Sequence, residues 1–221
     1  MAVTDFTPIV DARPDDTVWR PMSWPPPADV RLAGRVVEMR LADASRDGAE
    51  LFAALDDARV WAHMPVTRPD IGGFMEFLVS RRAAGMWTWT VRLRAPVAGL
   101  AAGAVVGMSS YLDVSVRDAR LEIGATAYRP EVWATAVNPD TKLLLLGYAF
   151  DELGAGRVQL KTDVRNVRAQ RAIARLGARY EGTLGRYQRR ADGTVRDTVL
   201  FAVLAEDWPA VAAGLRAGLE A

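Results

Sequence analysis

Residues 129–177, RPEVWATAVNPDTKLLLLGYAFDELGAGRVQLKTDVRNVRAQRAIARLG, decide the fold of this chain. Asparagine is a favoured N-cap, proline suits the first helical position, and aspartate stabilises the positive end of a helix dipole, so Asn138, Pro139 and Asp140 predict a helix start. Apolar residues then recur at helical spacing as far as Leu153, and Gly154 predicts the end of the helix. The stretch therefore opens with a loop and an amphipathic helix.

A strand and a second helix follow in the same stretch. Residues 157–162 alternate apolar and polar side chains, Asn166 predicts a second N-cap, and Gly177 stands where the second helix should end. Residues 121–128, LEIGATAY, also read as a strand, so the unit is strand, loop, helix, strand. A helical crossover of this kind predicts two parallel strands with a right-handed connection.

The loop WATAVN, residues 133–138, lies at the carboxyl end of the first of these strands and directly before a helix. Backbone N–H groups at a helix N-terminus are free and the dipole there is positive, which favours a phosphate or pyrophosphate. An ordinary crossover helix that binds only water is the alternative reading.

Short matches in a fixed order connect the chain to a known family. They are Glu122-Ile123-Gly124, Arg129-Pro130-Glu131, Tyr148-Ala149-Phe150, Glu152-Leu153-Gly154, Asn166 with Arg171 and Leu176-Gly177, Glu181-Gly182, Asp192-Gly193, Arg196-Asp197 and Asp207-Trp208-Pro209. With these matches the chain resembles the GNAT acetyltransferases, most closely the RimJ/RimL-like branch. The resemblance covers residues 34–211 and is strongest from Leu121 onward.

The resemblance implies an α+β fold with a mixed, mostly antiparallel sheet, helices on both faces and a splayed central parallel strand pair. It implies acetyl-CoA, or another acyl-CoA, as co-substrate, without a metal. The cofactor-binding residues that it implies are Thr126, Tyr128, Trp133, Ala134, Thr135, Ala136, Val137, Asn138, Asn166 and Arg171. In the family the pyrophosphate loop follows Q/R-x-x-G-x-G/A, and this chain has no glycine there.

Glu122 is the candidate catalytic base, because it begins the strand that would flank the thioester; an ordinary strand carboxylate is the alternative. The family often has a serine or tyrosine acid in the next helix, where this chain has Ala169 and Ile173. The single histidine, His63, could act as a base near neutral pH or be merely exposed. An arginine stripe, Arg168, Arg171 and Arg175, could meet CoA phosphates or form a solvated helix face.

Composition limits the classes of function. The chain has 221 residues, 25% of them charged, with a formal net charge of +1 and no cysteine. Near-neutral charge argues against a general field for nucleic acid or an anionic membrane, and the absence of thiols is typical of a cytoplasmic protein. The first 16 residues lack the features of a signal peptide, and no apolar run reaches the length of a membrane span.

Residues 1–33 are predicted to form a proline-rich arm, and residues 34–221 a single domain. Trp19 and Trp24 are costly to leave in water, so the arm should pack on its own domain or on a second copy in a homodimer. On a predicted strand, Trp87 and Trp89 share one face and could be core or could line a substrate pocket.

These observations predict an N-acyltransferase that moves an acetyl or other acyl group from acyl-CoA to a primary amine of a small molecule or protein N-terminus by direct attack. The second prediction, from another class, is a weakly active or inactive acyl-CoA sensor or scaffold with the same fold. The altered loop and the missing acid motivate it.

Overall fold

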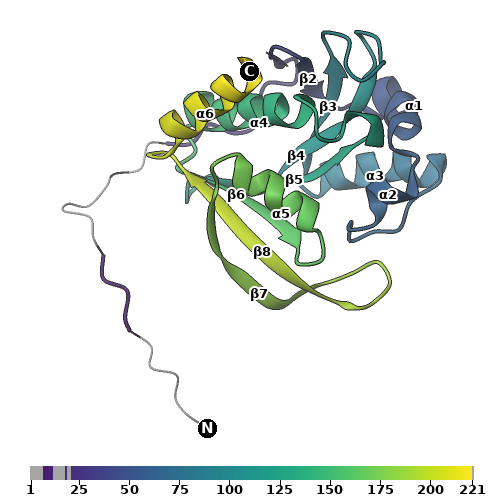
Figure 1. Cartoon of the computed structure of the whole chain (residues 1–221). Helices are drawn as coiled ribbons and strands as arrows, with labels where there is room; N and C mark the ends of the chain where they lie inside the picture. The colour runs from purple at the N-terminus through teal and green to yellow at the C-terminus, as the bar shows by residue number, and fades with distance from the viewer. Residues whose placement is uncertain (1–6, 12–17, 19–20, 221) are drawn as a thin grey trace.

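The computed structural model describes residues 7–11, 18 and 21–220. One eight-stranded sheet has the order β1-β2-β3-β4-β5-β6-β8-β7 (Figure 1). Its strands are β1 (Arg31–Ala33), β2 (Val37–Leu41), β3 (Trp87–Leu93), β4 (Val105–Ser115), β5 (Arg120–Tyr128), β6 (Arg157–Asp163), β7 (Arg179–Arg189) and β8 (Val195–Leu204). All neighbours are antiparallel except β5 and β6. The predicted fold class is thereby confirmed.

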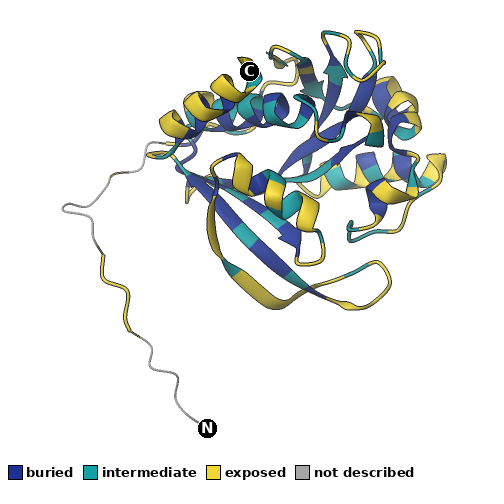
Figure 2. Ribbon diagram, viewed as in Figure 1, coloured by how far each residue is buried: buried dark blue, intermediate teal, exposed yellow. Residues whose placement is uncertain are grey.

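Helices cover both faces of this sheet (Figure 1). They are α1 (Ala44–Leu55), α2 (Ala58–Trp61), α3 (Ile71–Ala83), the 3-10 turn η1 (Pro130–Val132), α4 (Val137–Gly147), the π-helical turn η2 (Tyr148–Glu152), α5 (Val167–Arg175) and α6 (Trp208–Glu220). α1 and α3 share a core with Met108 and Ala127, whereas α4 and α6 share the larger core with Tyr111 and Leu121. Figure 2 shows that the inner strands are buried and that much of β7 is exposed.

The local signals in the sequence located most helix ends correctly. Asp43 caps α1 and Asn166 caps α5, each with its side chain accepting a backbone N–H. Asn138 is not an N-cap: α4 begins at Val137, two residues before the predicted first helical residue Pro139, and Ala136 before it provides no side-chain cap. The hydroxyl of Thr135 accepts the N–H of Val137 instead (3.3 Å), which allows the helix to start before the asparagine.

Other boundaries differ by a few residues. α3 begins at Ile71, with Asp70 as its N-cap, two residues after Pro69, where proline favours a helix start. The helix predicted to run to Leu153 changes to a π-helical turn after Gly147 and ends as predicted at Gly154, whose φ is +73°. The short elements β1 and α2 have no clear periodic signal in the sequence and were not predicted.

The arm makes contact with the body through the part of it that is described. Trp24 packs edge-on against Trp87, with ring centroids 5.2 Å apart, and Met22 is buried in the larger core. Trp19 lies outside the described residues. Trp89 is fully buried against Tyr111, which confirms the prediction that this tryptophan belongs to the core. None of the helices described is long and apolar enough to cross a membrane.

Candidate active site

The parallel pair separates part-way along its length. The β5–β6 ladder joins Arg120 to Arg157, Leu121 to Val158 and Glu122 to Gln159, and then ends, although both strands continue. Ligands of mixed and parallel sheets bind in the crevice at the carboxyl ends of such strands. The opening beyond Glu122 is therefore where a ligand would meet both strands.

The loop after β5 presents free backbone donors at this opening. Ala134 has a φ of +59°, in the left-handed region, so the loop adopts a glycine-like conformation without glycine. The amides of Ala134, Ala136 and Asn138 have no acceptor within the described part of the chain. With the N-terminus of α4 directly behind them, these amides suit an anionic group.

Replacing Ala134 with glycine tests this conformation. Because an L-residue with a Cβ is strained in the left-handed region by about 1–2 kcal/mol, Ala134→Gly should raise the free energy of unfolding by up to about 1 kcal/mol in chemical denaturation. Ala136 has an ordinary helical φ of −64°, so the control Ala136→Gly should lower it by about 0.5–1 kcal/mol. If both glycine variants are less stable than the wild type, the backbone of Ala134 is not strained.

Glu122 is buried at the end of the β5–β6 ladder. Its carboxylate pairs with the Lys161 ammonium at 2.6 Å and accepts a hydrogen bond from the Gln159 amide at 3.3 Å. A Cβ at Gly124 would lie 2.7 Å from the Glu122 carboxylate, so the glycine lets this group lie along β5 toward the opening. Burial raises the pKa of Glu122, and Lys161 opposes that rise. The result is a carboxylate that is more basic than usual.

A buried lysine holds the irregular end of β5. Lys142 of α4 donates hydrogen bonds to the hydroxyls of Thr126 (2.7 Å) and Ser109 (3.0 Å). The register between β4 and β5 shifts at this point, and Ala125 has a positive φ. Burial lowers the pKa of Lys142 to about 7. The side chain of Thr126 thus points to the lysine, and any contact with a ligand would come from the backbone.

At the carboxyl ends of β5 and β6, two arginines contact the ring of Trp133. The Arg168 guanidinium of α5 lies 3.5 Å from the centre of the Trp133 ring, and Arg59 of α2 lies 5.8 Å from it. The Trp133 indole N–H donates to the Tyr128 carbonyl at 2.9 Å. One member of the arginine stripe is therefore at the opening, stacked on the first residue of the loop.

The other predicted residues lie around this opening. Asn166 is occupied as the cap of α5, accepting the Ala169 amide at 3.0 Å. Arg171 is exposed on α5, and the Tyr128 side chain is buried in the core. Burial lowers the pKa of His63, and the Asp163 carboxylate opposes this, so His63 of the α2–α3 loop lies near the end of β6.

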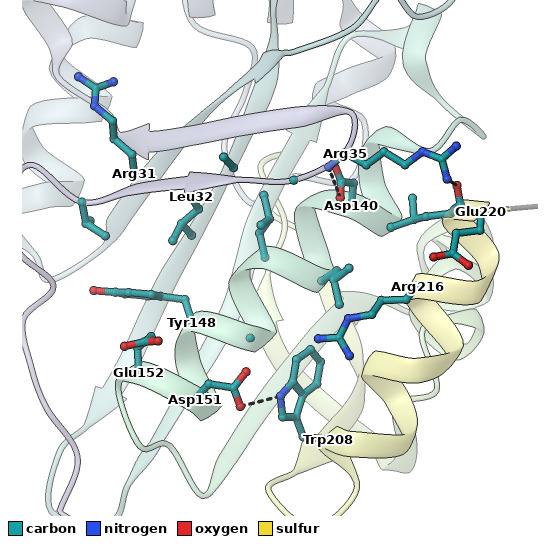
Figure 3. A pocket seen from close by; sticks show the side chains of 17 residues that line it. Arg31, Leu32, Arg35, Asp140, Tyr148, Asp151, Glu152, Trp208, Arg216 and Glu220 are labelled. Carbon is teal, nitrogen blue, oxygen red and sulfur yellow. Dashed lines mark hydrogen bonds between the residues drawn. The ribbon is translucent and has the colours of Figure 1, made fainter.

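Another groove lies away from this opening. It has a volume of about 690 Å³ between β1, α4 and α6 (Figure 3), and none of the predicted site residues lines it. In Figure 3 the Trp208 indole donates to Asp151, and Arg35 and Arg216 lie at one end. The strand opening, rather than this groove, has the free amides and the buried carboxylate, so it is the candidate active site.

Residue patterns did not identify several groups of this site. They are Ser109, Lys142, Gln159 and Lys161. One signal was present: Lys142 is spaced at i, i+3, i+4 and i+7 with Leu145, Leu146 and Ala149, on the buried stripe of α4. Within residues 7–11, 18 and 21–220, no group of three or more His, Asp or Glu side chains could hold a metal ion.

A mixed sheet whose two central parallel strands separate beside a helix N-terminus defines the fold of the GCN5-related acetyltransferases. Residues 35–179 match the family model described as "Acetyltransferase (GNAT) domain". The chain belongs to the GNAT acetyltransferase family. No curated protein matches it in sequence.

Solved structures of other proteins share the fold over most of the chain. A GCN5-related N-acetyltransferase from Brucella melitensis is 27% identical, with a TM-score of 0.81 over 91% of this chain and 89% of its own. A probable GNAT-family acetyltransferase from Chromobacterium violaceum is 28% identical, with a TM-score of 0.80 over 92% and 99%. Mycobacterium smegmatis RimJ in complex with CoA-disulfide is 22% identical, with a TM-score of 0.72 over 86% and 94%. At this identity the likeness shows the shared fold alone.

Proposed function

We propose that the chain transfers an acetyl or other acyl group from acyl-CoA to a primary amine of a small molecule or a protein N-terminus. The observation that carries the proposal is the opening of the β5–β6 ladder at Glu122, directly beside the free amides of Ala134, Ala136 and Asn138. The amides suit the diphosphate of CoA, and the opening between β5 and β6 suits the extended part of CoA that leads to the thioester. The CoA-disulfide bound to RimJ supports this use of the fold.

The reaction needs a neutral amine held against a polarised thioester. The amine nitrogen attacks the thioester carbon, the C–S bond breaks, and CoA leaves as the thiolate. Backbone N–H groups of β5 beyond its ladder with β6 are the donors available to the carbonyl oxygen. Holding the two reactants together contributes several kcal/mol to lowering the barrier.

Glu122 takes the proton that the amine loses, directly or through a water molecule. Its raised pKa improves it as a base, and its pairing with Lys161 favours the ionised form. Ala169 and Ile173 have no proton to donate. The CoA thiolate therefore takes its proton from water, and the proton held by Glu122 returns to the solvent.

Glu122→Gln should lower kcat by about 100-fold or more, because general-base catalysis contributes about 10²–10⁴. CoA release would be followed from pH 5 to 9. Since Lys161 opposes the rise in the pKa of Glu122, Lys161→Met should move the acidic limb of the kcat profile to higher pH. Glu50→Gln, in the exposed pair with Arg92, is the control and should leave the profile unchanged. An unaltered rate in Glu122→Gln would remove the base assignment.

A second function, an acyl-CoA sensor or scaffold, is favoured by the Arg168–Trp133 stack across the opening and by the strained, glycine-free loop. Titration calorimetry with acetyl-CoA, compared with CoA release over a panel of amines and N-terminal peptides, distinguishes the two. Tight binding without turnover would favour the sensor. Turnover of any amine well above hydrolysis would establish the transferase.

A further inference from the structure

A row of polar side chains continues from Glu122 across the sheet. Lys161 of β6 is paired in register with Leu200 of β8, and Asp163 with Thr198. Side chains of registered neighbours lie on the same face, and every second residue of a strand shares that face. Arg196 is two residues before Thr198, so it extends this row beyond the end of β6.

The first charges of the row are paired with one another. Lys161 pairs with Glu122 at 2.6 Å. Arg190 holds Asp163 in a fork, with Nε 2.6 Å and Nη2 2.9 Å from the two carboxylate oxygens. These two pairs are electrically balanced.

Arg196 is the charged residue of this row that forms no such pair. It is only 8% exposed, and its side chain makes no hydrogen bond or ion pair in the part of the chain that the structure describes. Burial lowers the pKa of Arg196, while the charges of Asp163 and Glu122 oppose this. The hydroxyl of Thr198, on the same face, is also buried without a partner. The row has three cations and two carboxylates.

An arrangement of this kind is costly without a ligand. A buried guanidinium without a bonded counter-ion and a buried donor without an acceptor both lower the stability of the native state. A carboxylate accepts two parallel hydrogen bonds from a guanidinium and can accept another from a hydroxyl. The surplus of one positive charge in the row matches a monoanion better than a phosphate dianion.

We propose that Arg196, with Thr198, binds a carboxylate of the acceptor, so that the acceptor is a primary amine that carries a carboxylate group. This inference rests on the proposed function, because it places the acceptor on the sheet face where Glu122 lies. The amine is held toward Glu122, and the carboxylate extends along the row toward Arg196. The two sources of this chemistry are free amino acids and peptides with an acidic residue near the N-terminus.

The test compares acceptors that differ only at the carboxylate. Alanine, β-alanine and 4-aminobutyrate would each be paired with its carboxamide, and Ala-Glu-Ala-amide with Ala-Gln-Ala-amide. CoA release gives kcat/KM for each. At least one carboxylate should exceed its amide by tenfold or more, mainly through KM. The pair with the largest ratio of kcat/KM shows whether the acceptor is a free amino acid or a peptide.

Variants then assign that ratio to Arg196. Arg196→Gln should bring it close to one by raising KM, and Arg196→Lys should restore part of it. Arg189→Gln removes the same charge from the opposite face of the hairpin, since Arg189 pairs with Val195. This control should keep the ratio. Circular dichroism and melting temperature verify that each variant is folded.

The outcomes separate the inference from the proposed function. Turnover with equal kcat/KM for carboxylates and amides in the wild-type protein would overturn the inference and keep the transferase. If no amine is turned over, calorimetry of the acetyl-CoA-bound protein with the same pairs decides. Carboxylate binding that is lost in Arg196→Gln and kept in Arg189→Gln supports the site, and equal binding of acid and amide overturns it.

Discussion

Lys142→Met is expected to remove a rise of about 3 kcal/mol in the free energy of unfolding between pH 7 and 9. The native pKa of Lys142 is lowered by burial from 10.5 to about 7. Between these values the unfolded chain holds a proton that the native protein lacks, so stability rises with pH by about 1.4 kcal/mol for each unit. It is lost again as the pH falls toward 7.

The methionine variant should also be more stable than the wild type below pH 7, where the buried lysine has a charge without a carboxylate partner. Methionine fills a similar volume, and the hydroxyls of Ser109 and Thr126 are already 2.8 Å apart and can bond to each other. Urea unfolding at several pH values gives both results. Ser109→Ala retains the lysine and should keep the slope, and a slope that persists in Lys142→Met would rule out this lysine as its source.

Asp140→Ala should lower the free energy of unfolding by about 3–5 kcal/mol, because three backbone donors lose their acceptor and each such loss costs about 1–3 kcal/mol. Asp140 is 1% exposed, and its carboxylate accepts the backbone N–H groups of Val36 (2.7 Å), Val37 (2.9 Å) and Arg35 (3.3 Å). It therefore ties the β1–β2 turn to the first turn of α4. Without it, these donors lose their acceptor in a poorly solvated turn.

For a chain of this size the loss corresponds to a fall of about 10 °C in melting temperature, measurable by calorimetry. Gly34→Ala disturbs the same contact, because the added Cβ would clash with the Asp140 carboxylate. It should also destabilise the protein. Asp118→Ala, in an exposed turn, is the control and should change the melting temperature little. A similar small change in Asp140→Ala would show that the turn does not depend on the carboxylate.

Asp140 also shows what a local sequence pattern can predict and what it cannot. As an acidic residue in the first turn of a helix it was identified correctly, but its three amide partners lie more than 100 residues earlier in the chain. Glu122 was likewise chosen for its place at the start of a strand. Its partner Lys161 became apparent only when β6 was placed beside β5.

The sequence by itself determined the succession of elements around residues 129–177, the parallel pair that they form, and the family. Those features depend on caps, glycines and periodicities that act within a few residues of one another. Only the tertiary structure decided that Lys142 is buried against two hydroxyls, and that Arg196 has no carboxylate bonded to it among the residues described. Such pairings depend on strand register and on the packing of distant segments, and no short stretch of sequence specifies them.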